Sequence, residues 1–76
     1  MALPTPMRYR PADEQICRTL REGRNLATNI ADETDLSRQY VSDRLGELAQ
    51  AGHIENLGSG LYELEDEPNW SEVLEE

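Results

Sequence analysis

The sequence predicts one small α+β domain, mainly helical, with three helices, a two-stranded β-hairpin and a possible short C-terminal helix. Three observations support this fold class. The chain has 76 residues, which is enough for a single small core. Helical periodicity follows a strong start signal at Ser37, and two β-prone runs, Ile54–Leu57 and Leu61–Leu64, flank a glycine-bearing connection.

Composition excludes several classes of protein. No apolar run approaches the roughly 18 residues of a membrane span, and no export signal begins the chain. One cysteine cannot form an internal disulfide, and with one histidine it does not furnish a usual zinc site. We therefore expect a cytoplasmic protein with no metal, cofactor or small-molecule ligand. So short a chain leaves little room for a water-excluded cleft, and an enzyme is not expected.

Charge is distributed unevenly along the chain. Residues 1–44 hold all 7 arginines and 7 acids, whereas residues 45–76 hold 9 acids and no base, which gives the net charge of −9. A nucleic-acid-binding protein normally has a basic face, so composition argues mildly against DNA. An acidic chain without lysine is also typical of salt-saturated cytoplasms, where salt screens the self-repulsion. Under this halophilic interpretation, net charge says little about partners.

Proline positions and charge divide the chain into three parts: residues 1–10 as an extended arm, 11–65 as the domain, and 66–76 as an acidic tail or short helix. The first helix begins at Pro11 or Ala12 and ends at Gly23. Its buried face carries Ile16, Cys17 and Leu20. A short second helix is expected from an N-cap at Thr28 to about Thr34, with Ile30 and Ala31 facing inward.

The third helix has the clearest boundaries. Ser37 is its N-cap and Gly52 stops it after Ala51, and removing the cap should cost about 1 kcal/mol. Its buried stripe follows the i, i+4, i+7, i+8 pattern of Val41, Leu45, Leu48 and Ala49.

A short amphipathic helix is predicted at the C-terminal end. Trp70, Val73 and Leu74 have i, i+3, i+4 spacing, and Asn69 or Ser71 is the cap. These three apolar residues form either a dimer contact or a contact with helix 11–22.

The order of elements and the spacing of small and apolar residues fit a helix-turn-helix followed by a hairpin. Ala31 permits a close helix crossing, Leu36 fills the turn, Ser37 restarts the chain, and Gly52 leads into the hairpin. The chain resembles the winged helix-turn-helix family over residues 11–65. The segments 36–42 and 58–62 are most similar to small phage-repressor-type regulators of halophilic archaea.

The resemblance implies that helix 37–51 lies in the major groove of DNA. At about 100° per residue, Gln39, Ser42, Asp43 and Gly46 face away from the buried stripe. The expected DNA-binding residues are Ser37, Arg38, Gln39, Tyr40, Ser42, Asp43, Arg44 and Ser59.

Individual roles follow from side-chain chemistry. Gln39 suits adenine and Arg38 guanine, whereas Arg44 and Tyr40 are placed for phosphates. Asp43 is tolerable there if it accepts from a cytosine amino group or pairs with Arg38 or Arg44. The connection 58–60 has no arginine and offers only backbone N–H groups and the Ser59 hydroxyl.

Together these features predict a sequence-specific regulator that binds double-stranded DNA as a homodimer and acts as a repressor. Three alternatives stay open at this level. The same fold could dock on a transcription or replication protein. The acidic half could mimic DNA. The polar face of helix 37–51 could also be an ordinary solvated surface.

Overall fold

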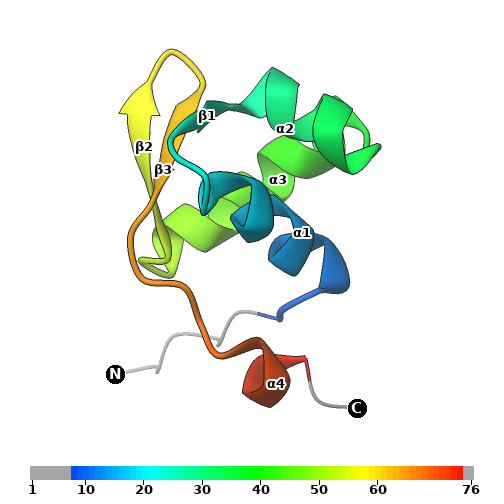
Figure 1. The fold of residues 1–76 in the computed structure, drawn as a ribbon, viewed down its shortest axis with the longest axis vertical. Coiled ribbons are helices and arrows are strands. Elements are labelled where there is room, and N and C mark those ends of the chain that lie inside the picture. The colour runs from blue at the N-terminus through cyan, green and yellow to red at the C-terminus, as the bar shows by residue number, and fades with distance from the viewer. Residues whose placement is uncertain (1–7, 75–76) are drawn as a thin grey trace, which may run out of the picture.

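Residues 8–74 of the computed structural model form four helices and a three-stranded antiparallel sheet, an α+β arrangement as predicted (Figure 1). The predictions for residues 1–7 and 75–76 lie outside the described residues. In chain order the elements are α1 (Pro11–Leu20), β1 (Asn25–Leu26), α2 (Ala27–Thr34), α3 (Arg38–Gln50), β2 (Ile54–Gly58), β3 (Leu61–Leu64) and α4 (Trp70–Val73).

Helix α1 begins at Pro11, as predicted, because proline suits the first helical turn. It ends at Leu20, three residues before Gly23, whose φ of +136° suits a glycine in the following turn. The predicted apolar face is confirmed, since Ile16, Cys17 and Leu20 are all buried.

Helix α2 begins two residues earlier than predicted. Leu26, not Thr28, is its N-cap, and the prediction of a Thr28 cap was wrong. The physical reason is tertiary: the backbone N–H of Ala27 donates to the carbonyl of Gly60 at 2.9 Å, so the hairpin fixes where the chain turns from β1 into α2.

The turn between α2 and α3 comprises residues 35–37. Asp35 takes a left-handed conformation with φ of +62°, which aspartate tolerates better than most residues. Leu36 is half-buried against the core, as expected for a residue that fills the turn.

Helix α3 has the predicted start. The Oγ of Ser37 accepts from the backbone N–H of Tyr40 at 3.1 Å, which confirms the N-cap. Of the predicted stripe, Val41, Leu45 and Leu48 are fully buried, whereas Ala49 is half-buried against the core. The helix ends at Gln50 with Ala51 as its C-cap.

The sheet has the order β1-β3-β2, so the predicted two-stranded hairpin gains a third strand. Asn25 and Leu26 of β1 pair with Tyr62 and Leu61 of β3. A two-residue strand carries no periodicity of its own, and only its pairing with β3 reveals it.

The hairpin itself is confirmed, but its connection is shorter than predicted. Gly58 pairs with Leu61, so only Ser59 and Gly60 form the turn, with φ of +54° and +79°. Positive φ at both central residues matches the twist of a two-residue hairpin. The register shifts between Asn56 and Gly58, which leaves Leu57 at a bulge.

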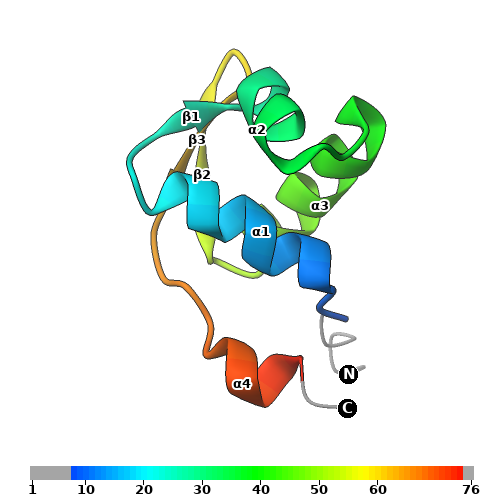
Figure 2. The same ribbon diagram turned by 45° about the vertical axis from the view of Figure 1, so that its right-hand side comes forward.

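The core lies where α1, α2, α3 and β2 meet. It is formed by nine buried residues: Ile16, Cys17, Leu20, Ile30, Ala31, Val41, Leu45, Leu48 and Ile54. Helix α4 lies at the end of the molecule opposite the hairpin tip, away from the turn between α2 and α3 (Figures 1 and 2). Asn69 caps α4 by accepting from the N–H of Ser71. Among residues 8–74, none of the helices is both long and apolar enough to traverse a bilayer.

Candidate nucleic-acid interface

Helix α3 presents a polar strip on the side opposite its buried stripe. Gln39, Ser42, Asp43 and Gly46 are exposed, as the helical geometry predicted. Arg38, at the edge of this strip, is exposed too. Neither α4 nor the hairpin covers these residues, so the strip is accessible to a partner.

The other predicted site residues are partly engaged in the fold. The Oγ of Ser37 caps α3, although the residue is exposed. Tyr40 is half-buried. Ser59 is exposed at the hairpin tip, and its left-handed backbone belongs to the turn.

Arg44 does not belong to the exposed strip. Its Nε and Nη2 donate to the two carboxylate oxygens of Asp13 at 2.8 and 2.9 Å, and Nη2 also donates to the carbonyl of Arg8 at 3.0 Å. The Arg44 side chain is 12% exposed and that of Asp13 is 0% exposed. Three of the five N–H donors of Arg44 are thus used within the fold, which disfavours the expected phosphate contact. These hydrogen bonds raise the pKa of Arg44 and keep it charged.

Asp43 has a partner that the sequence did not predict. Its Oδ1 accepts a hydrogen bond from Nε2 of Gln39 at 3.0 Å, one helical turn away. Of the two kinds of partner that would make Asp43 tolerable on this strip, an arginine is not found within residues 8–74, because Arg44 pairs with Asp13 and Arg38 has no ion pair. The contact with a cytosine amino group stays a prediction. The strip thus contains an oriented amide–carboxylate pair.

Three exposed arginines form ion pairs with neighbouring acids. Arg18 pairs with Glu14, Arg21 with Glu67 and Arg24 with Glu63, at N–O distances of 3.6, 2.5 and 3.2 Å. Arg38 has no ion pair with any residue from 8 to 74. The α3 strip consequently carries one accessible guanidinium rather than a basic patch.

One face of the hairpin is acidic. Glu55 of β2 lies directly opposite Glu63 of β3. The proximity of Glu55, with a smaller contribution from the charge of Glu63, raises the pKa of Glu65. Like charges in cross-strand positions repel each other, and concentrated salt reduces that repulsion.

The C-terminal segment is attached to the domain through Glu67. Its carboxylate accepts from Arg21 Nε at 2.8 Å and from the indole N–H of Trp70. The ring of Trp70 packs against the core and meets Tyr9 edge-on, with centroids 6.1 Å apart. Trp70 therefore has an intrachain role, while Val73 and Leu74 are half-buried.

Residues 8–10, predicted as part of an extended arm, also contact the domain. The hydroxyl of Tyr9 lies 2.6 Å from Nε2 of His53, and Nδ1 of His53 lies 2.6 Å from the carbonyl of Asp66. His53 thereby joins the two ends of the described chain. Proline content predicted an extended backbone here, but not that it would pack.

The sequence analysis did not identify Asp13 as the partner of Arg44. It precedes Ile16, Cys17 and Leu20 by three, four and seven residues, so it lies on the apolar face of α1. A carboxylate at such a position requires a buried partner. On α3, Arg44 is next to the buried Leu45, and a cation at that position was the sequence signal for a partner of Asp13.

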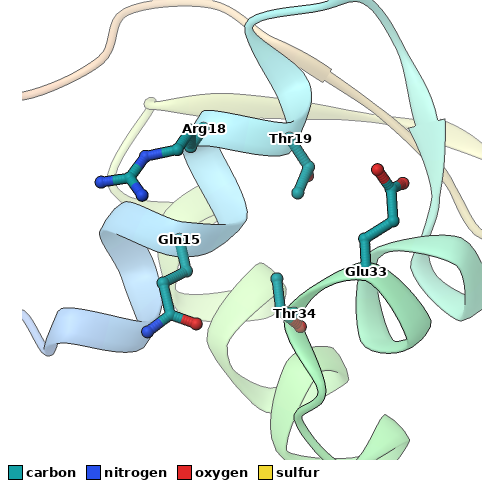
Figure 3. A pocket seen from close by; sticks show the side chains of 5 residues that line it. All are labelled: Gln15, Arg18, Thr19, Glu33 and Thr34. Carbon is teal, nitrogen blue, oxygen red and sulfur yellow. The ribbon is translucent and has the colours of Figure 1, made fainter.

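A shallow hollow of about 250 Å³ lies between α1 and α2 (Figure 3). Five polar residues line it: Gln15, Arg18, Thr19, Glu33 and Thr34. Small-molecule sites are mostly apolar, and this lining does not resemble one. Within the described part of the chain, no group of three or more His, Cys, Asp or Glu side chains is arranged to hold a metal ion.

Comparison with known proteins adds no relative. A scan against models of protein families, a search of curated proteins and a search of solved structures each found no significant match to this chain.

Proposed function

We propose that this chain is a winged helix-turn-helix regulator that binds double-stranded DNA sequence-specifically and represses transcription, with α3 in the major groove. The order α1, β1, α2, α3, β2, β3 and the three-residue turn 35–37 are compatible with that fold. The observation that most strongly supports this proposal is the accessible polar strip of α3, which lies opposite Val41, Leu45 and Leu48. A capped helix that leaves its polar side uncovered can enter a groove wide enough for a helix.

Base contacts, rather than phosphate contacts, would supply most of the specificity. Gln39 offers an amide suited to adenine, and Arg38, which has no ion pair within residues 8–74, offers a guanidinium suited to guanine. Because Arg44 is bound to Asp13, few cations remain for the DNA backbone. If the protein neutralises three phosphates, the logarithm of the association constant for DNA should fall by only about 2.7 for each tenfold rise in salt concentration. Such a shallow dependence suits binding in concentrated salt.

A homodimer would compensate for the small contact area. One strip with one accessible arginine gives few contacts, and a symmetric dimer doubles them by binding two half-sites about one helical turn apart. Val73 and Leu74, half-buried at the end of the molecule that carries α4, are the residues we assign to that contact.

The proposal can be tested by selection from random duplexes in molar potassium chloride. We expect an enriched sequence, and we expect Arg38→Ala and Gln39→Ala to lose preference for it while remaining folded. Arg18→Ala and Gln15→Ala are matched controls, because both residues are exposed on α1. Equal binding by all four variants would reject α3 as the recognition helix.

The acidic hairpin supports one rival. A face bearing Glu55, Glu63 and Glu65 repels DNA and could instead dock on a basic protein, either as an interaction module or as a DNA mimic. The same selection separates the two functions. No enrichment from any duplex library, together with salt-sensitive capture of a basic transcription or replication protein through Glu55 and Glu63, would favour the rival.

A further inference from the structure

Gln39 and Asp43 form the one side-chain hydrogen bond between exposed groups of α3 within residues 8–74. Nε2 of Gln39 donates to Oδ1 of Asp43 at 3.0 Å, with the i, i+4 spacing that brings side chains together on a helix. Both residues are exposed and lie on the strip that faces away from the core. This contact requires an explanation, because a carboxylate on a DNA-binding surface should repel the duplex.

The bond fixes which groups of Gln39 remain free. A primary amide has two N–H donors and one oxygen acceptor, whereas an ionised carboxylate only accepts. Asp43 can therefore bind only the NH₂ side of the amide and uses one of its two protons. One N–H and Oε1 of Gln39 remain for a partner.

This remaining pair of groups matches adenine and not guanine. In the major groove, adenine presents the N7 acceptor beside the N6 amino donor, whereas guanine presents two acceptors, N7 and O6. An unrestrained glutamine could turn both N–H groups toward guanine. With one proton held by Asp43, it cannot satisfy both guanine acceptors.

We propose that Asp43 is a positioning residue that restricts Gln39 to adenine. This inference rests on the proposed function, since it concerns the same surface of α3. It gives the acidic residue a role in specificity: Asp43 reduces affinity for every duplex through its charge, but it reduces affinity for guanine most.

The experiment starts from the selected duplex. The base that Gln39 contacts is the position at which Gln39→Ala loses preference, and the duplex is then made with each of the four base pairs there. Dissociation constants of the unaltered protein, Asp43→Ala and Asp43→Asn are measured in molar potassium chloride, with helix content checked by circular dichroism.

We expect the unaltered protein to prefer adenine. Asp43→Ala should bind every duplex more tightly. Its preference for the adenine duplex over the guanine duplex, measured as the ratio of the two dissociation constants, should be about tenfold smaller than that of the unaltered protein. Asp43→Asn removes the charge but keeps an oxygen acceptor, so it should bind more tightly with most of the ratio retained.

Two results would overturn the proposal without touching the proposed function. One is a uniform gain in affinity for all four duplexes in Asp43→Ala, which would mean that Asp43 only repels phosphate. The other is a preference for a base other than adenine at this position. Absence of any sequence preference in the unaltered protein would instead reject the proposed function and this inference with it.

Discussion

Arg44 of α3 donates two hydrogen bonds to the carboxylate of Asp13 in α1, at 2.8 and 2.9 Å, in a site where Asp13 is fully buried. The same carboxylate accepts from the backbone N–H of Arg10 at 2.9 Å, which ties down the start of α1. Both oxygens are thus satisfied, as a buried charge requires. The pair connects α1 to the proposed recognition helix and fixes its orientation.

Removal of one partner of this pair should be severely destabilising. Asp13→Ala leaves the Arg44 guanidinium largely buried without a counter-charge, and we expect a loss of about 3 kcal/mol or more in the free energy of unfolding. That is a large part of the free energy of unfolding expected for a domain of this size. Urea denaturation in high salt measures the change.

The matched control replaces both partners. Asp13→Leu combined with Arg44→Met removes both charges together, so it should recover most of the lost stability. The bond from the Arg10 N–H to Asp13 is still lost, which leaves a deficit of about 1 kcal/mol. A double variant as unstable as Asp13→Ala would contradict a purely compensatory role for the pair.

Gly46 should be a site where stability and binding move in opposite directions. It lies within α3, where glycine costs about 1 kcal/mol relative to alanine, and a Cβ there would meet nothing within 4 Å. No packing within residues 8–74 therefore requires this glycine. If its role is close approach to DNA, Gly46→Ala should raise the free energy of unfolding by up to about 1 kcal/mol and weaken duplex binding by about tenfold.

Thermal denaturation and duplex titration of the same preparation check both effects. Gln15→Ala on the exposed face of α1 is the control and should leave DNA binding unchanged. Improved stability with unaltered affinity would show that glycine is merely tolerated at this position.

The buried thiol of Cys17 should make the folded protein less stable at alkaline pH. Burial raises the pKa of its thiol from 9.0 to about 12, with smaller contributions from the charges of Glu67 and Asp13. Above the unfolded pKa, the unfolded chain releases a proton that the folded protein retains. The free energy of unfolding should therefore fall, by up to about 1.4 kcal/mol per pH unit for this group.

Denaturation curves at several pH values between about 8 and 11 test this linkage. Cys17→Ala is less stable at neutral pH because it leaves a small cavity, but it should lose the cysteine-dependent part of the alkaline slope. Parallel pH profiles for the two proteins would show that the thiol ionises equally well in the folded state.

Trp70 should contribute to the stability of its own chain rather than to self-association. Its indole N–H donates to Glu67 and its ring packs against the core and Tyr9. For a half-buried tryptophan we expect Trp70→Ala to cost about 2 kcal/mol, while the sedimentation mass at matched concentration stays unchanged. Glu72→Ala, an exposed change in α4, should alter neither quantity. A drop in mass for Trp70→Ala alone would assign this residue to a dimer contact instead.

The sequence alone determined the features that depend on neighbouring residues. The Ser37 cap, the stripe of Val41, Leu45 and Leu48, and the glycine-bearing hairpin are all local patterns, and all were confirmed. They follow from helical periodicity, capping and turn chemistry, which act over a few residues. The solvent-facing side of α3 followed from the same periodicity.

Only the tertiary structure decided which polar groups meet. Strand β1 exists through its pairing with β3, and α2 starts at Ala27 through a bond to Gly60. Arg44 and Asp13 are 31 positions apart; helical spacing places Asp13 on the apolar face of α1 but does not identify Arg44 as its partner. Burial makes such partners obligatory, because an unpaired charge in the core is costly, but the fold must first bring them together. For that reason, periodicity predicted the exposed face of α3, whereas the engagement of Arg44 with Asp13 was seen only in three dimensions. The pairing of Gln39 with Asp43, by contrast, has the i, i+4 spacing of a local helical contact.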